Sequence, residues 1–389
     1  MTPYESNNLF GNLQPNLAVE AQLRYAIQMS GPITFAHLMQ MSLHDELGYY
    51  NSAHVGIGSV GESIDFTTSP EAHESFGRTL ANSFYAMWGA LGRPDEFDVV
   101  EVGGGNGTLM RDIYRKIETD YPELHRTARY EIIEQSAHLV DKQRQLLAGT
   151  RVICSHEPAT TARRSLKGVV YNNEFLDTIP VHRLIRMPEG IREFYVGLDT
   201  DGAFTELLGP VSLDAQNSFD QRELEEGVEH TVAPMIDVWQ RRVAENLVQG
   251  YVLTVDYGID QRGDRGRARQ PRVYSRASPE RTGYPVEYAY ASLGAMDITT
   301  SVDFERLAAS GIRYGLVPVV MTRQAEFLRQ WGFEQERDRI IREYEAAGSG
   351  ILPMTHYFSS YPLTAADGMG NFTVLVQSKN ANPHLPALF

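Results

Sequence analysis

The stretch VVEVGGGNGTLMRDIYRKI, residues 99–117, decides the fold. Apolar β-forming residues run into a cluster of glycines, and a pattern with helical spacing follows at once. Glycine lacks a Cβ, so a turn made of glycines lets the backbone approach a ligand closely. A strand, a glycine-rich turn and a helix in this order are typical of the α/β unit that holds a nucleotide-like cofactor. We therefore expect a cofactor at this turn.

Strands and helices alternate from residue 97 towards the end of the chain. Further strands are expected at 129–135, 151–154, 168–174, 250–258 and 371–379, with helical patterns between most of them. Their nearly continuous apolar runs are typical of parallel strands that are covered on both faces. The sequence therefore predicts an α/β fold with a mainly parallel sheet.

Two parts of the chain depart from this alternation. Residues 1–88 have helical and loop patterns without an evident strand, so we expect an N-terminal helical cap there and the core at 89–389. The core carries two expected insertions, a β meander plus helices at about 183–248 and an aromatic, loop-rich segment at about 260–300. The first insertion alternates in hydrophobicity between turns at PEG and DTDG, as antiparallel hairpins do.

The composition excludes several classes of protein. The 389 residues include 35 basic and 50 acidic ones, a net charge of −15 that disfavours a broad nucleic-acid-binding face. No apolar run reaches the roughly 18 residues of a membrane span, and the N-terminus resembles neither a signal nor a transit peptide. The single cysteine, Cys154, rules out a disulfide framework, and the histidines lack metal-ligand spacing. We expect a cytoplasmic protein with no nucleic-acid, membrane or metal partner.

The spacing of the glycines bears on which cofactor is held. Gly103, Gly105 and Gly107 give G-x-G-x-G, whereas the dinucleotide fingerprint is G-x-G-x-x-G and would place its third glycine at Thr108. That fingerprint also needs an acid about 20 residues further on, and the next acid at a strand end, Glu134, lies well beyond that distance. No Gly-Lys-Ser/Thr follows the loop, so the phosphate-binding Walker pattern fails as well.

S-adenosylmethionine is the remaining common cofactor of such a turn. It carries no phosphate, and the free N–H groups at the start of the following helix suit its carboxylate. Glu101, at the end of the first strand, is placed to face its ammonium group. Glu134 ends the second strand, and an ionised carboxylate offers two acceptor oxygens for the two ribose hydroxyls. The alternative for the glycine loop is a tight turn without a ligand, and the alternative for Glu134 is a solvated strand end.

Three further stretches carry a resemblance to a known family. GPITFAHLMQMSLHDELGYYNS, DFTTSPEAHESFGRTLA and NNEFLDTIPVHRL resemble the MidA-like family of S-adenosylmethionine-dependent methyltransferases. VDYG, DITTSVDF, QAEFL and DGMGNFTVL continue the likeness in order, from about Gly31 to Val376. The mitochondrial member of this family is a complex I assembly factor that dimethylates an arginine side chain. The resemblance implies a class I methyltransferase, that is, a Rossmann-like, mainly parallel sheet with an N-terminal helical cap and a smaller inserted lobe that contains β-strands.

The resemblance also implies cofactor contacts. They come from the segment after the cap loop, from the glycine loop and from two strand ends: Thr68, Ser69, Gly103, Gly105, Gly107, Glu134 with Gln135, Asn172 and Asn173. Glu101 joins this set because of its place at the end of the first strand. The chain departs from the family at Gly104, where proline is usual, at Asn106, where a basic residue is usual, and at Arg78, where an acid is usual. These departures leave the cofactor site intact, and they bear on which acceptor is methylated.

The acceptor side is expected to use carboxylates. Methyl transfer is an in-line displacement, so the enzyme must align the acceptor and remove a proton from it. Glu174 ends the fourth strand and Asp177 follows it closely, so both belong to the ligand-binding edge of the sheet. A guanidinium is charged, and paired carboxylates match its fork geometry. The alternatives are that Glu174 holds the cofactor or a cap backbone, and that Asp177 caps the following turn.

Aromatic residues after the fifth strand are further acceptor candidates. Tyr257 and Tyr288 are expected to line a pocket for a flat, apolar or cationic acceptor, and His182 is a candidate base. Ordinary packing of the tyrosines and a structural histidine are the alternatives. Two methyltransferase hypotheses differ in the acceptor. In the first the acceptor is a protein arginine, and in the second it is a small or carrier-bound metabolite. A non-catalytic assembly chaperone with the same fold and an NAD-dependent enzyme are the hypotheses of other classes.

Overall fold

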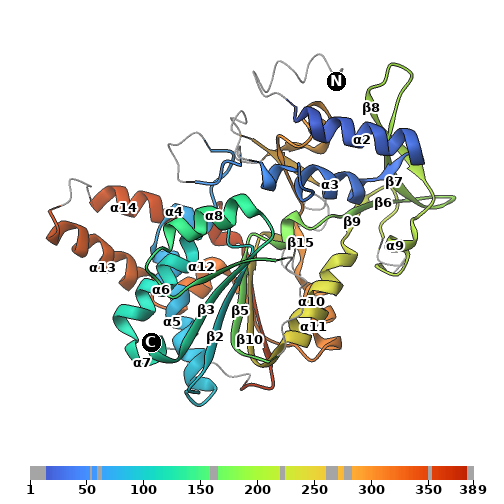
Figure 1. Cartoon of the computed structure of the whole chain (residues 1–389). Helices are drawn as coiled ribbons and strands as arrows, with labels where there is room; N and C mark the ends of the chain where they lie inside the picture. Colours follow the sequence, from blue (N-terminus) through green and yellow to red (C-terminus); the bar gives the residue numbers. More distant parts are fainter. Residues whose placement is uncertain are drawn as a thin grey trace.

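The computed structural model describes residues 15–52, 55–58, 64–157, 165–219, 224–259, 270–275, 283–348 and 353–382. A large sheet with helices on both faces occupies one end of the molecule, and a second lobe sits beyond the carboxyl ends of its parallel strands (Figure 1). The α/β fold class and the class I methyltransferase architecture expected from the sequence are confirmed.

The large sheet has seven strands in the order β16-β17-β10-β5-β2-β3-β4. The five strands from β10 to β4 run parallel, and β17 is antiparallel to both of its neighbours. Their bounds are β2 (Phe97–Val102), β3 (Ala128–Glu134), β4 (Ile153–His156), β5 (Leu166–Asn173), β10 (Leu247–Asp256), β16 (Val317–Arg323) and β17 (Thr373–Lys379). Every residue of β2 is buried, Asp98 and Glu101 included, which explains why the other positions are apolar.

Helices cover this sheet on both faces. One layer holds α5 (Ser75–Ala90), α6 (Thr108–Asp120), α7 (Pro122–Thr127), α12 (Gln324–Gln330) and α13 (Phe333–Ala346), and the other holds α10 (Pro234–Asn246) and α11 (Phe304–Arg313) (Figure 1). Helix α8 (Ala137–Leu146) joins β3 to β4, and α14 (Pro353–Ser360) follows α13. Each layer shares a continuous apolar cluster with one face of the sheet.

The second lobe combines the start of the chain with the first insertion. Its sheet has the order β1-β7-β6-β9, with β8 paired to β7. The elements are α2 (Leu17–Ser30), β1 (Ile33–Thr34), α3 (Phe35–Leu43), β6 (His182–Met187), β7 (Gly190–Leu198), β8 (Phe204–Gly209), α9 (Leu213–Gln216) and β9 (Glu229–Val232). The first two helices are capped by side chains, because Asn16 accepts from two backbone N–H groups of α2 and Thr34 accepts from one of α3.

Several elements differ from the sequence-based expectation. The N-terminal region contributes a short strand, because β1 pairs with β7 through Ile33–Val196 and Thr34–Tyr195. Helix α5 packs in the core of the large sheet, and α10 packs there too. The described part of the second insertion forms a three-stranded sheet of β12 (Arg272–Tyr274), β13 (Tyr284–Pro285) and β14 (Asp297–Thr299) with η4 (Val286–Ala291). A two-residue strand is too short to leave a periodic signal, which is why β1 was not expected.

The remaining elements are short. They are η1 (Tyr49–Asn51), α4 (Ser69–Ala72), η2 (Leu176–Thr178), β11 (Gly258–Ile259), β15 (Val302–Asp303), η5 (Tyr361–Leu363) and η6 (Met369–Asn371). Three of them, η1, α4 and η2, bring cap and strand-end residues to the carboxyl edge of the sheet, where the candidate site lies.

Candidate active site

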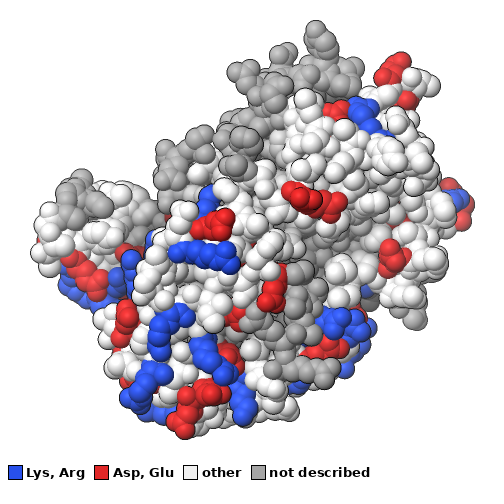
Figure 2. All heavy atoms as spheres, in the orientation of Figure 1, with Lys and Arg blue, Asp and Glu red and all other residues white. Residues whose placement is uncertain are grey.

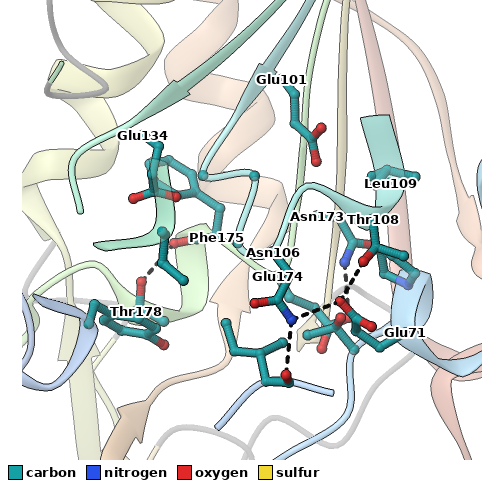
Figure 3. A pocket seen from close by; sticks show the side chains of 18 of the residues that line it. Glu71, Glu101, Asn106, Thr108, Leu109, Glu134, Asn173, Glu174, Phe175 and Thr178 are labelled. Atoms are coloured by element: carbon teal, nitrogen blue, oxygen red, sulfur yellow. Dashed lines mark hydrogen bonds between the residues drawn. The ribbon is translucent and has the colours of Figure 1, made fainter. Parts of the chain in front are cut away.

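A pocket opens at the carboxyl ends of β2, β3 and β5, between the large sheet and the cap (Figure 3). Its wall is made by the glycine loop, by strand-end residues and by cap residues: His44, Tyr50, Ile57, Phe66, Thr68, Pro70, Glu71, Glu101, Gly103, Gly104, Gly105, Asn106, Thr108, Leu109, Ile133, Glu134, Gln135, Leu139, Asn173, Glu174, Phe175 and Thr178. Most of the expected cofactor contacts are in this set, so the structure brings them together.

The glycine loop owes its shape to positive φ angles. Gly103 has φ 72° and Gly105 has φ 53°, a region that costs an L-residue roughly 1–2 kcal/mol. Gly107, with φ 86°, begins helix α6 and packs against Gln143 outside the pocket wall, so its role is to start the helix. The Gln143 amide donates to the Gly105 carbonyl at 2.9 Å, which fixes the loop from behind.

Two strand-end carboxyls face the pocket from β2 and β3. Glu101 is 3% exposed, and its carboxylate accepts from the Tyr171 hydroxyl at 3.3 Å. Burial raises the pKa of Glu101 to about 8. Glu134 accepts from the Ser136 backbone N–H at 2.9 Å, and burial raises its pKa to about 6. A cationic or hydroxyl-bearing ligand would add favourable partners for these desolvated carboxyls.

Glu174 stands where β5 ends. Its backbone has φ 48°, a left-handed conformation that is uncommon for a residue other than glycine and that concentrates at functional sites. Its carboxylate accepts from the Ser69 backbone N–H at 2.9 Å and from the Asn173 side chain at 3.0 Å. Burial, the first cause, and the nearby charge of Asp177 raise the pKa of Glu174 to about 8.

Asp177 lies behind the pocket wall, in η2. Burial raises its pKa to about 7, and the nearby Tyr257 hydroxyl opposes that rise. In the part of the chain that the structure describes, the buried Asp177 Oδ1 and Tyr257 hydroxyl lie close together without a hydrogen bond of good geometry. Asp256 holds this turn, because its Oδ2 accepts from the backbone N–H groups of Leu176 and Asp177 at 3.0 and 3.2 Å.

Some expected site residues lie elsewhere. The Ser69 hydroxyl donates to the side-chain oxygen of Gln324, and the Asn172 amide donates to the Thr254 hydroxyl. Both residues are fully buried, so they lie behind the pocket wall. His182 is in β6 of the second lobe, where its Nδ1 is 2.7 Å from a Glu193 carboxylate oxygen. Tyr288 packs against Tyr284 in the lobe core, with ring centroids 5.5 Å apart.

Further cap residues, which the sequence patterns do not predict, complete the pocket wall. Glu71, from α4, accepts from the Thr108 hydroxyl at 2.8 Å and from the Asn106 side chain at 3.1 Å (Figure 3). His44 and Tyr50 line the opposite part of the wall. An acid directly after Thr-Ser-Pro at a short helix start is a signal for Glu71, but its contact with the glycine loop is tertiary.

The donor set fits S-adenosylmethionine. The glycine turn brings backbone close to the pocket, and the two strand-end carboxyls offer acceptors. The buried Asn173 Oδ1 has no hydrogen-bond partner among the residues that the structure describes. Among the described residues, no group of histidine, cysteine and carboxylate side chains could hold a metal ion. In that same part of the chain, no helix is both long and apolar enough to cross a bilayer.

Comparison with known proteins gives consistent results. Mouse protein arginine methyltransferase NDUFAF7, mitochondrial, is 29% identical over 362 residues, which cover 85% of this chain and 76% of the mouse protein. The human protein of that name is 28% identical over 349 residues, covering 80% and 73%. A crystal structure of a Burkholderia thailandensis protein bound to S-adenosyl-homocysteine matches the fold with a TM-score of 0.80, at 24% identity, covering 95% of this chain and 94% of that one.

A family model carries the assignment further. It is described as "Putative S-adenosyl-L-methionine-dependent methyltransferase" and matches residues 79–322, well over half of the chain. That range includes the glycine loop, both strand-end carboxyls and Glu174. The chain therefore belongs to this family of S-adenosylmethionine-dependent methyltransferases, as its resemblance to the MidA-like enzymes predicts.

Proposed function

We propose that this enzyme methylates a guanidinium nitrogen of an arginine side chain in a protein. The observation that carries the proposal is the carboxylate of Glu174, which lies on the pocket wall with its orientation fixed by Ser69 and Asn173. Asp177 adds a second buried carboxyl close behind it. Carboxylates match the planar, charged fork of a guanidinium better than they match a neutral acceptor. The name of the mouse and human relatives supports the same acceptor.

The proposed chemistry assigns Glu174 two tasks. S-adenosylmethionine supplies the methyl group from its sulfonium. As the new N–C bond forms and the S–C bond breaks, the attacking nitrogen must lose a proton, and Glu174 accepts it. Its pKa of about 8 suits this task near neutral pH, and the approaching guanidinium lowers that pKa by its positive charge. Before transfer, the same carboxylate orients the guanidinium by hydrogen bonding.

The test uses radiolabelled S-adenosylmethionine and arginine-containing peptides. After acid hydrolysis, we expect labelled methylarginine with the wild-type enzyme and a loss of about 100-fold or more with Glu174→Gln. The affinity for S-adenosylhomocysteine should stay within about threefold, because Gln keeps the oxygen that Ser69 donates to. Glu46→Gln, an exposed change in the cap, is the matched control. Full activity of Glu174→Gln would contradict the assignment.

A second acceptor class is favoured by the aromatic part of the wall. Tyr50, Phe66 and Phe175 line the pocket, and such rings also bind a flat, apolar metabolite. If the second candidate holds, guanidino peptides stay unlabelled while a small aromatic acceptor becomes labelled. The same assay, with the products separated by mass spectrometry, therefore distinguishes the two acceptors.

A further inference from the structure

His44 occupies a position that connects the two halves of the pocket. It follows helix α3, at the point where the chain turns towards η1. Its ring lies nearly parallel to that of Tyr50, with 5.7 Å between centroids and 12° between planes. Both side chains belong to the pocket wall.

Each ring nitrogen of His44 has a partner from a different element of the core. Nδ1 is 2.8 Å from the side-chain Nε2 of Gln135, at the end of β3. Nε2 is 2.8 Å from the backbone oxygen of Thr178, in η2. An amide nitrogen only donates and a carbonyl oxygen only accepts, so Nδ1 must accept and Nε2 must carry the hydrogen. Burial lowers the pKa of His44, which favours this neutral ring.

These partners belong to the two functional ends of the pocket. Gln135 follows Glu134, the carboxyl expected to take the ribose hydroxyls, and its side chain is otherwise exposed. Thr178 ends the three-residue η2 that begins just after Glu174 and Phe175. An exposed glutamine has several rotamers, so a hydrogen bond that selects one of them lowers the entropy lost when the cofactor binds.

We propose that His44 is a positioning residue for the cofactor, which fixes the Gln135 side chain against the ribose end of the pocket and anchors it to the acid-bearing turn at Thr178. The proposal rests on the methyltransferase family and on these contacts, and it is independent of which acceptor is methylated. It adds His44 to the cofactor contacts that the sequence predicts on the strand ends, on the glycine loop and at Thr68 and Ser69.

The test is a double-mutant cycle on the affinity for S-adenosylhomocysteine, measured by calorimetry. His44→Phe keeps a ring for Tyr50 and removes both hydrogen bonds, and Gln135→Ala removes the partner. We expect each single change to raise Kd about fivefold, the effect of one ordering hydrogen bond. The Kd of the double variant should stay near that of the single variants, because both changes break the same contact. Two independent changes would instead multiply to a rise of about 25-fold. An additive cycle overturns the proposal.

Two further measurements separate positioning from mere packing. His44→Gln keeps one donor and one acceptor, and it should hold Kd within about twofold of the wild-type value. His37→Phe, on the exposed side of the same helix, is the matched control and should also be neutral. Nitrogen NMR of the wild-type protein tests the same proposal without any variant, so it applies even if His44→Phe fails to fold. We expect His44 to be the neutral Nε2–H tautomer at pH 7. An Nδ1–H tautomer or a charged His44 ring overturns the proposal.

Discussion

Glu174 illustrates which site residues a sequence can predict. The ends of parallel strands carry Glu174, Glu101, Glu134 and Asn173. A parallel sheet gathers the ends of its strands along one edge. Strand patterns therefore predict their meeting without any knowledge of the rest of the fold. Asn172 shows the limit, since successive residues of a strand face opposite ways, and this side chain points into the sheet packing.

Glu71 and His44 could not be placed in this way. Their helices are short or end close to the site, and their partners in the core are 35 to 134 residues away along the chain. Neither hydrophobic periodicity nor a motif encodes such a contact, because it depends on how the cap docks on the strand ends. The same holds for His182, whose apolar neighbours gave no hint of its carboxylate partner, Glu193.

Replacement of Glu71 should weaken cofactor binding. In Glu71→Ala, Asn106 and Thr108 lose the carboxylate that ties the glycine loop to α4, so the loop becomes less ordered before binding. We expect Kd for S-adenosylhomocysteine to rise about tenfold, as for the loss of one charge-assisted hydrogen bond. Glu71→Gln keeps an acceptor oxygen and should stay within about threefold. Calorimetry measures both Kd values. An equal loss of affinity in Glu71→Ala and Glu71→Gln would contradict a hydrogen-bonding role for Glu71.

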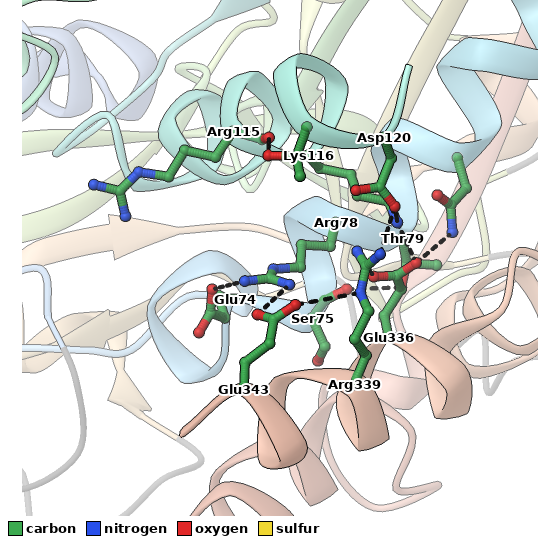
Figure 4. Close-up of polar contacts among 12 residues, drawn as sticks. Glu74, Ser75, Arg78, Thr79, Arg115, Lys116, Asp120, Glu336, Arg339 and Glu343 are labelled. Atoms are coloured by element: carbon green, nitrogen blue, oxygen red, sulfur yellow. Dashed lines mark hydrogen bonds and ion pairs between the residues drawn. The ribbon is translucent and has the colours of Figure 1, made fainter. Parts of the chain in front are cut away.

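At the scale of elements, a buried ionic cluster joins three helices (Figure 4). Lys116 of α6, with a side chain 3% exposed, contacts Asp120 at 2.7 Å and Glu336 of α13 at 2.5 Å. Arg339 bonds Glu336 at 2.8 Å, and the Asn82 amide of α5 donates to Glu336 at 3.3 Å. This cluster fixes how α13 lies on the layer of helices that covers the sheet.

Removal of the buried cation should destabilise this layer strongly. Lys116→Met leaves the carboxylates of Asp120 and Glu336 with one cation fewer, and breaking a buried pair in this way costs about 3–5 kcal/mol of unfolding free energy. Denaturant unfolding measures the loss. Arg115→Met, one residue away on the exposed side of α6, should change the unfolding free energy by less than about 0.5 kcal/mol. Equal stability of the two variants would refute the role of the cluster.

The sequence predicts the helices and strands themselves better than it predicts which of them pack together. Helix α6 and strands β2, β3 and β10 follow their hydrophobic patterns closely. The contact of β1 with β7 and the placement of α5 and α10 against the large sheet depend on long-range packing instead. Hydrophobic periodicity shows that a helix has an apolar face, but it does not show which sheet that face will meet.

At the scale of the whole molecule, charge is distributed unevenly between surface and interior. On the face shown in Figure 2, lysine and arginine side chains alternate with acidic ones over the large-sheet domain. Several other carboxyls are buried at the site with raised pKa values, about 8 for Glu101 and Glu174 and about 7 for Asp177. With pKa values of about 8, Glu101 and Glu174 are mostly protonated at pH 7, so the folded chain is less negative than the formal net charge of −15, which counts every carboxyl as ionised.

These carboxyls make stability depend on pH. Their pKa values are higher in the folded chain than in the unfolded chain, so between about pH 4.5 and 8 the folded state binds more protons. The unfolding free energy should consequently fall as pH rises through this range. Each tenfold change in proton affinity corresponds to about 1.4 kcal/mol, so the sum amounts to several kcal/mol.

Thermal unfolding of the cofactor-free enzyme between pH 5.5 and 8.5 measures this effect. We expect Tm to fall towards pH 8.5, and we expect a shallower fall in Glu101→Gln, because an amide has no proton to lose. Glu46→Gln, an exposed change, should follow the wild-type curve. The pKa values of His73 and His44 are lowered by burial, so these histidines oppose the fall below about pH 6.5. A Tm that rises with pH between about pH 7 and 8.5 would show that these carboxyls are ionised in the folded protein.

The pairing of β1 with β7 has a consequence for synthesis on the ribosome. Ile33 leaves the exit tunnel about 160 residues before its partner Val196, which at roughly 5–20 residues per second is a delay of about 10–30 s. During that time the apolar faces of α2 and α3 have no sheet to cover. The nascent lobe is thus unfinished at this stage, and a chaperone that binds amphipathic helices would protect it until the meander and the second insertion are made.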